Sequence, residues 1–367
     1  MDPRIAKMRS GSYLLTMGQL SSAVTQIGDL AWSIYSGGLT QTGKALGKSV
    51  VRKSAITKKD IGIDKIAQEF TEVPGASKIL DRVFTLSGLN YIDSLGKEAL
   101  INSTIGRYQK QAKKGKFSSS LQERLDEAFS EKELPKVIED LKSGNITDDI
   151  KYLAHYTLSD FQPVSLSEMP EYYLKSPNGR IMYMLKSYQI KQFNVIRDEA
   201  FKKMNQGKTA KEKTEGVRRL IYLASVLMLT GMTSDKIKNF MYGREQELDE
   251  MVTDNLLRLF GFNKYLVYVQ KRYKNWAYTA LKFMAPPVFL LNPLFESAMQ
   301  DLDKFYRTKK KGEKYKIPED VKTVKNLPLI GKFYYEYFGP GKEYNMKRKE
   351  EKQKKGKKKK RKFYGRE

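Results

Sequence analysis

The stretch 13-YLLTMGQLSSAVTQIGDLAWSI-34 decides the fold class, because its apolar residues recur at the spacing of an α-helix. Seven of them follow one another at alternating steps of four and three, namely Tyr13, Met17, Leu20, Val24, Ile27, Ala31 and Ile34. This spacing places them along one face of a helix. Gly37 and Gly38 come next and are suited to end it. We therefore expect one continuous helix, with Met17, Leu20, Val24 and Ile27 as packing residues.

The rest of the chain shows helical patterns without the marks of strands. Further helices are expected at roughly 39–52, 60–71, 76–114, 118–130, 132–142 and 146–157, then from Arg180 to about 204, at 217–231, at 246–282 and from Asn292 to Tyr306. The polar stretch 205–216 is expected to be a connection. Alternating apolar and polar residues bounded by turn pairs, which mark strands, are almost absent. The sequence therefore predicts an all-α protein, an irregular multi-helix bundle.

Composition divides the chain into four parts. We expect an N-terminal helical region at 1–115, connecting short helices at 116–164, a C-terminal helical region ending in an aromatic helix at 165–345, and a lysine-rich tail at 346–367. The tail is highly charged and has almost nothing apolar to bury, so we expect it to be disordered. There is no internal repeat at the period of a solenoid.

The chain is strongly basic, with a formal net charge of +26 over 367 residues. The charge is densest between residues 347 and 362, where twelve basic residues face two acidic ones. The basic residues are Lys347, Arg348, Lys349, Lys352, Lys354, Lys355, Lys357, Lys358, Lys359, Lys360, Arg361 and Lys362. Such a charge draws a protein to nucleic acid or to anionic lipid, so these residues are the candidate polyanion-binding site. A tail that only keeps the protein soluble is the alternative.

Two stretches of the chain are apolar enough to be considered as membrane spans. LIYLASVLMLTG (220–231) would extend about 18 Å as a helix, against about 30 Å for the hydrocarbon core of a bilayer. FMAPPVFLLNPLF (283–295) is of similar length and contains three prolines. Neither stretch is long enough by itself to span a bilayer, so we interpret both as buried core helices, with interfacial segments as the alternative.

One stretch resembles a phosphate-binding loop. GLTQTGKA (38–45) has the spacing Gly-x-x-x-x-Gly-Lys, but Ala45 stands where the motif needs a Ser or Thr to hold Mg²⁺. The overlapping GKALGKS (43–49) has one residue too few between its glycines. The motif should also follow a strand, whereas this stretch follows a helix. We therefore expect a glycine-rich connection between helices and no nucleotide site.

The remaining chemistry-bearing residues do not assemble into a recognisable catalytic pattern. There is no cysteine, and His155 is the only histidine, so a thiolate or multi-histidine metal site is excluded. Carboxylates in EQELDEMVTD (245–254) and LDEAF (125–129) alternate with apolar residues at helical spacing, which is typical of a solvated helix face. The sequence predicts a protein that is not an enzyme and has no catalytic residue, cofactor or metal.

An aromatic cluster lies near the C-terminus, in NLPLIGKFYYEYFGPGKEYN (326–345). Phe333, Tyr334, Tyr337 and Phe338 would share one wide face of a short helix that ends at Gly339-Pro340-Gly341. We expect these four side chains to be buried, docking the last helix on the core. Contact with a protein partner or a membrane interface, and stacking on nucleic-acid bases, are the alternatives.

The same stretch resembles the closing motif of a large polyvalent protein-associated domain of tailed phages, the type numbered thirty-eight. Two more stretches are similar to other motifs of that family: SYLLTMGQLSSAVTQIGDLAWSIYSGGL (12–39) to its opening helix, and IMYMLKSYQIKQFNVIRDEA (181–200) to a later helix. The resemblance spans most of the chain, and the family supplies no catalytic residues to carry over.

This resemblance implies a phage internal virion protein of the ejection type, held inside the capsid and released into the host envelope or cytoplasm with the genome. The implied partners are phage DNA bound without sequence specificity, other virion proteins, an anionic membrane surface and further copies of the chain. A general nucleic-acid-binding protein with a helical body and a lysine-rich tail is the alternative.

Overall fold

The computed structural model describes residues 2–63, 76–162, 194–207, 209–244, 248–259, 286–316 and 320–347, with a few isolated positions between them. The described part is helical and contains no strand, so the predicted all-α fold is confirmed. Residues 64–71 of the helix predicted at 60–71, residues 260–282 of the helix predicted at 246–282, and most of 180–193 lie outside the described residues. The described start of the first of these, 60–62, is a turn and not a helix.

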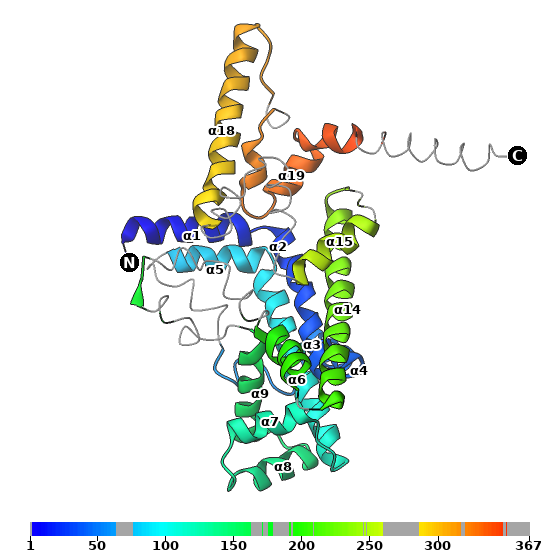
Figure 1. Cartoon of the computed structure of the whole chain (residues 1–367). Coiled ribbons are helices and arrows are strands. Elements are labelled where there is room, and N and C mark those ends of the chain that lie inside the picture. Colours follow the sequence, from blue (N-terminus) through cyan, green and yellow to red (C-terminus); the bar gives the residue numbers. More distant parts are fainter. Residues whose placement is uncertain are drawn as a thin grey trace, which may run out of the picture.

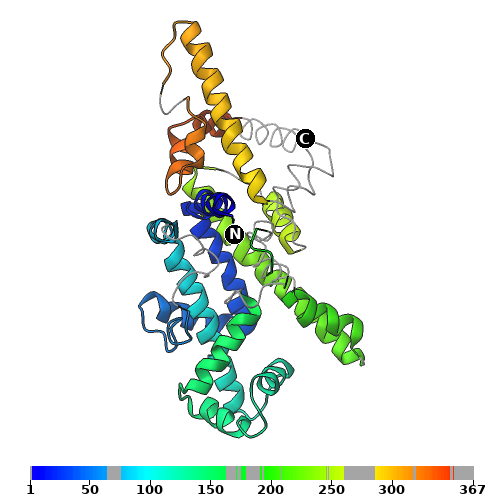
Figure 2. The same ribbon diagram turned by 90° about the vertical axis from the view of Figure 1, so that its left-hand side faces the viewer.

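The helices have the following bounds: α1 Pro3–Met17, α2 Leu20–Thr25, η1 Gln26–Asp29, α3 Leu30–Gly37, α4 Leu39–Val50, α5 Ala76–Leu86, α6 Leu89–Lys113, α7 Ser119–Ala128, α8 Leu134–Ser143, α9 Asp148–Phe161, η4 Arg197–Phe201, α13 Lys202–Gln206, α14 Ala210–Met241, α15 Leu248–Leu259, α18 Pro286–Lys310, η5 Thr323–Asn326 and α19 Gly331–Tyr337. Figures 1 and 2 show an elongated arrangement, with α18 projecting at one end and α7 and α8 at the other.

The predicted continuous helix over residues 13–36 is wrong, because it is divided into α1, α2, η1 and α3. The first break lies at Gly18, whose carbonyl oxygen accepts a hydrogen bond from the backbone N–H of Leu329 at 2.7 Å. A Cβ at Gly18 would come within 2.9 Å of the Val83 side chain, so the close approach requires glycine. The predicted C-terminal end of this helical stretch is confirmed, since α3 stops at Gly37 and Gly38 has a φ of +83°.

The predicted packing residues of this region lie on the inner side of the broken helix. Val24 is buried, while Met17, Leu20 and Ile27 are partly buried. The second break, at η1, is hydrogen bonded to α14. From α14, Thr230 Oγ1 donates to the Gly28 carbonyl at 3.2 Å, and Ser234 Oγ donates to the Val24 carbonyl at 3.0 Å.

The main core forms where α3, α6 and α9 meet. Trp32 of α3 is fully buried, and its ring centroid lies 5.8 Å from that of Phe161 at the end of α9. Leu100 and Ile101 of α6 and Leu223 of α14 belong to the same cluster. Residues from all three predicted helical regions therefore contribute to one core. Burying such side chains is the dominant stabilising term in folding.

The predicted helix over 76–114 is interrupted by Ser87 and Gly88, which separate α5 from α6. Gly88 has a φ of +75°, a conformation that glycine adopts without strain. Two expectations concern the stretch after α3: the helix at 39–52 is confirmed as α4, which ends at Val50, and the glycine-rich connection at 38–49 is wrong. Neither Gly43 nor Gly47 has a neighbour within 4 Å of a Cβ built on it, so both are tolerated as exposed helical positions.

The predicted polar connection over 205–216 is shorter than expected. Thr209 and Glu212 form a capping box, in which the Thr209 side chain accepts from the Glu212 N–H and the Glu212 carboxylate accepts from the Thr209 N–H. This motif satisfies two backbone donors and starts α14 at residue 210. The helix then runs for 32 residues, alongside α3 in Figure 1.

LIYLASVLMLTG is the middle of α14 and not a separate short helix, so its own length no longer argues against a membrane span. Among the described residues, α14 alone is long and apolar enough to cross a bilayer, although 33% of its most apolar window is buried inside the protein. The interpretation as a buried core helix is therefore half right. Leu223 and Val226 are buried, whereas Ile221 and Leu229 are 62% and 61% exposed.

The C-terminal part departs from the prediction at two points. α18 begins at Pro286 instead of Asn292, because proline fits the first turn of a helix and residues 286 and 287 are both proline. Beyond the turn at 338–340, where the last helix was expected to stop, residues 341–347 are helical again. The disorder expected for the tail at 346–367 stays a prediction. Of the tail cations, Lys347 is described and exposed, and the other eleven lie outside the described residues.

Candidate anion-binding pocket

A tight elbow joins α3 to α4, with Gly38 as its only linking residue. The elbow lies against α6, and a Cβ added to Gly37 would come within 2.4 Å of the Ser103 side chain. The buried hydroxyls of Ser36 and Thr104 are hydrogen bonded to each other at 2.7 Å across the same contact. The glycine pair thus lets α3 and α4 both pack closely on α6.

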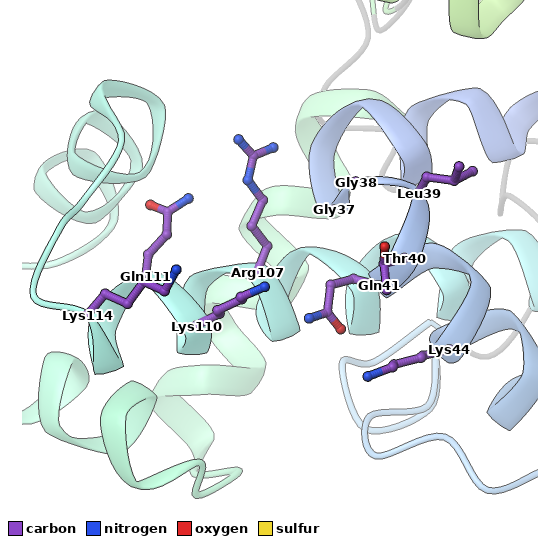
Figure 3. Close-up of a pocket in the computed structure, with 10 residues that line it drawn as sticks. All are labelled: Gly37, Gly38, Leu39, Thr40, Gln41, Lys44, Arg107, Lys110, Gln111 and Lys114. Carbon is purple, nitrogen blue, oxygen red and sulfur yellow. The ribbon is translucent and has the colours of Figure 1, made fainter.

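A cavity of about 390 Å³ opens beside this elbow, between α4 and the C-terminal half of α6 (Figure 3). We call it the lysine pocket. It is lined by Gly37, Gly38, Leu39, Thr40, Gln41, Lys44, Arg107, Lys110, Gln111 and Lys114. Four of these residues are cationic and none is acidic. Since α4 and α6 are held together by the elbow, the cations of the two helices face a common space.

The three lysines of the pocket have no carboxylate partner within the described ranges of the chain. Lys44, Lys110 and Lys114 are all exposed. Other lysines of the protein are paired: Lys97 with Asp93 at 2.7 Å and Lys136 with Asp149 at 2.6 Å. The C-terminal end of α6 favours cations through the helix dipole, which helps to explain Lys110 and Lys114 but not Lys44 in α4.

Arg107, which lines the lysine pocket, is held in place by backbone carbonyls of α3. Its Nη1 donates to the Ser36 carbonyl at 2.8 Å and to the Tyr35 carbonyl at 3.4 Å. These carbonyls belong to the last turn of α3, where backbone acceptors lack helical partners. A guanidinium has five N–H donors, so further donors of Arg107 remain for a ligand. Across the elbow, Gly38 provides no side chain to cap α4.

A second cavity of about 440 Å³ shares Gly38 and Arg107 with the first. We call it the arginine pocket; its other lining residues are Tyr35, Ser36, Tyr108, Ser118, Ser120, Arg124, Phe161, Glu215, Arg218, Arg219 and Tyr222. Three of its four arginines have a carboxylate partner, although Arg218 and Arg219 share Glu215. Arg124 Nε lies 2.8 Å from Asp160, and Arg219 Nε lies 3.1 Å from Glu215.

The predicted aromatic face of the last helix is arranged differently from the expectation. Phe333, Tyr334, Tyr337 and Phe338 are between 37% and 54% exposed, so the prediction that they are buried is wrong. They pack in pairs along the helix, with ring centroids 4.5 Å apart for Phe333 and Tyr337 and 5.1 Å apart for Tyr334 and Phe338.

The buried side of α19 carries a charged residue instead. Glu336 is buried, where it pairs with Arg244 and accepts a hydrogen bond from Asn345 Nδ2 at 2.7 Å. A buried carboxylate needs such partners to offset its loss of hydration. Close by, burial raises the pKa of Tyr242 and of Tyr335, and it lowers the pKa of Lys325. The four exposed rings therefore stay candidates for contact with a partner.

Sequence reasoning overlooked the lysine pocket, although parts of it were visible. The rejected phosphate-loop stretch 38–45 provides Gly38 and Lys44, and the basic stretch 110–116 provides Lys110 and Lys114. Neither stretch predicts that it faces the other. Among the described residues no group of three His, Asp or Glu side chains could hold a metal ion.

No protein-family model, curated protein or solved structure matches this chain. The likeness to the phage domain therefore stays a hypothesis that rests on the three quoted motifs.

Proposed function

We propose that this protein is a non-enzymatic structural component of a tailed-phage particle, one that packs with the genomic DNA and associates with the host envelope after ejection. The three motif resemblances support the phage origin. The observation that carries the proposal is the net charge of +26, which is densest in the sequence of the tail and includes the three lysines of the lysine pocket. Contacts to phosphates bind DNA without reading its sequence.

Association with the envelope draws on the apolar surface of α14. Ile221, Leu229 and Phe240 are exposed along this helix, and its apolar window reaches the length of a membrane span. The exposed rings of α19 offer a further surface for other virion proteins or for a second copy of the chain. Aromatic side chains are enriched at protein interfaces and at membrane–water interfaces.

The DNA part of the proposal is tested by binding to two duplexes of equal length and unrelated sequence, over a series of salt concentrations. We expect equal dissociation constants for the two, and a slope of log K against log salt of about −5 to −9 for about six to ten phosphate contacts. Removing residues 351–367 deletes nine of the twelve tail cations and should make the slope shallower. A tenfold preference for one duplex would contradict the proposal.

The virion part is tested by protease treatment of purified phage particles that carry the gene. A protein stored inside the capsid should resist digestion until the capsid is opened by heat or chelation, as judged by immunoblotting. A surface-exposed tail protein of the same particle is the control, since it should be digested at once. If the protein is found only in infected cells and not in particles, the alternative of a general nucleic-acid-binding protein is supported.

A further inference from the structure

We propose, building on the DNA partner above, that the lysine pocket holds one backbone phosphate of a single-stranded nucleic acid while the ring of Tyr222 stacks on the adjoining base. The two cavities share Gly38 and Arg107, so groups bound in them would be neighbours on one strand. Single-strand binding commonly combines a cationic groove for the backbone with aromatic rings for the bases.

The case for a phosphate begins with the charges around the cavity. Lys44 reaches the space from α4, and Lys110 and Lys114 reach it from α6 (Figure 3). Without a carboxylate in the lining, these cations repel one another, and an anion placed between them relieves that repulsion. A cleft lined by one sign of charge also concentrates counterions within it.

The geometry of the elbow adds directed donors to this field. Arg107 is fixed by the carbonyls of Tyr35 and Ser36, so its remaining N–H groups are presented without a further loss of side-chain freedom. The cavity volume of about 390 Å³ lies near the lower end of the range of about 300–1,000 Å³ for small-molecule sites. It therefore suits a phosphate with its sugar and not a large ligand.

The case for a base rests on Tyr222 of α14. Its hydroxyl donates to the Ile34 carbonyl at 3.1 Å, and its ring centroid lies 6.0 Å from that of the buried Tyr35. The ring is therefore fixed on one side, yet the residue is 42% exposed. Every base has a flat face that can stack on such a ring, whatever its identity. A duplex keeps its bases stacked inside, so the arrangement favours single strands.

The test measures how the full-length protein binds twelve-nucleotide oligothymidine and a duplex of the same length, using fluorescence anisotropy at fixed salt. The tail attracts both forms, the duplex more strongly because of its higher charge density. Since every variant keeps the tail, a change in the ratio of the two affinities between variants reports on the pocket. We expect the natural chain to favour the single strand about tenfold, since stacking one base contributes roughly a factor of 5 to 150.

Two triple variants of equal charge isolate the pocket. Lys44→Gln, Lys110→Gln and Lys114→Gln together should abolish the preference for the single strand. The control combines Lys48→Gln, Lys113→Gln and Lys116→Gln, three exposed lysines of the same region that do not line the pocket. It should keep the preference. Equal losses in both variants would overturn the inference, and circular dichroism checks that both are folded.

Tyr222 is tested by replacement and by the ligand. Tyr222→Phe keeps the ring and should keep the preference, whereas Tyr222→Ala should lower single-strand affinity about tenfold. An oligonucleotide of abasic sites should bind the natural chain and Tyr222→Ala alike. If Tyr222→Ala binds oligothymidine as well as Tyr222→Phe does, the stacking role is wrong.

Two further ligands separate other sources of phosphate. If the pocket triple variant loses binding to phosphatidylserine vesicles but keeps the single-strand preference, the pocket serves a lipid headgroup and the inference fails. If inorganic phosphate raises the melting temperature of the natural chain but not of that variant, while strand binding is equal, the ligand is free phosphate and the inference also fails. If the natural chain binds neither form of DNA, the proposed function fails as well.

Discussion

The two pockets on either side of Arg107 differ in how their positive charges are balanced. In the arginine pocket, Arg124 and Arg219 are paired with Asp160 and Glu215. The first pair joins α7 to α9, and the second lies within α14, whose Arg219 also donates to Ser119 Oγ of α7 at 3.2 Å. In the lysine pocket, Lys44, Lys110 and Lys114 face a cavity without a carboxylate. The comparison teaches that a count of cations does not identify a ligand site, because carboxylates of the same protein can already balance them.

The largest effect is expected at the elbow that both pockets share. Gly37→Ala would place a Cβ within 2.4 Å of the Ser103 side chain and 2.7 Å of its backbone carbonyl carbon. Since neither helix can yield easily, we expect a loss of about 3 kcal/mol in the free energy of unfolding, measured by urea denaturation. Both pockets should be disturbed together.

A matched glycine substitution provides the control for that experiment. Gly43 lies at an exposed position of α4, the next helix, and a Cβ added there would have no atom within 4 Å. Gly43→Ala should stabilise the protein by about 0.5–1 kcal/mol, because alanine favours helix more than glycine does. A destabilised Gly43→Ala protein would show that α4 is not helical in solution.

The next largest effect is expected at Arg124, whose charge serves the structure and not DNA binding. Arg124→Met removes the ion pair with Asp160, the hydrogen bond to Tyr108 Oη at 3.3 Å and the contact with the Phe161 ring. Because Asp160 is partly exposed, we expect about 2 kcal/mol of destabilisation. The DNA affinity of the folded fraction should be unchanged; a tenfold loss of affinity in a fully folded sample would contradict the assigned structural role.

Gln41→Glu adds a carboxylate to the lining of the lysine pocket, as in the arginine pocket, without removing any cation. The new carboxylate would lie in the lining beside Lys44 and near the N-terminus of α4, where negative charge is favourable. We expect about tenfold weaker binding to single-stranded DNA, together with about 0.5 kcal/mol of added stability. Unchanged affinity, measured by anisotropy, would show that the pocket does not bind the strand.

The smallest effect is expected for the reverse conversion. Glu215→Gln would remove the carboxylate that pairs with Arg218 at 3.8 Å and with Arg219 at 3.1 Å. We expect about threefold tighter binding to single-stranded DNA. The two arginines would no longer be held by a carboxylate, and a partly exposed ion pair of this kind contributes about 0.5 kcal/mol. Glu212→Gln on the same helix, outside both pockets, is the control for the change in net charge; equal gains would indicate a nonspecific effect.

The sequence predicted what depends on local spacing. The helical repeat from Tyr13 onward predicted the helical class, and Gly37 with Gly38 predicted where α3 ends. The break at Gly18 could not be read locally, because it depends on the N–H of Leu329. The long continuation of α14 was missed because the apolar run was judged without the capping box at Thr209.

The same limit applies to the sites. Lys44 and Lys110 were visible as residues, but their meeting depends on the packing of α4 on α6. The aromatic cluster was expected to be buried because aromatic side chains bury large areas. Glu336 lies on the inner side instead, where it pairs with Arg244. This partner is 92 residues earlier in the chain, so local spacing could not predict the pair.

The contact between Gly18 and the segment before α19 has a consequence for biosynthesis. Gln19 Nε2 also donates to the Lys325 carbonyl at 3.3 Å, at a sequence separation of 306. The break between α1 and α2 is therefore completed by residues that are synthesised about 300 positions later. A nascent chain must hold α1 and α2 in an unfinished arrangement until residue 329 has been made, which is characteristic of slow folding through non-local contacts. Premature termination before residue 325 would thus perturb α1 and α2 as well as the segment that is lost.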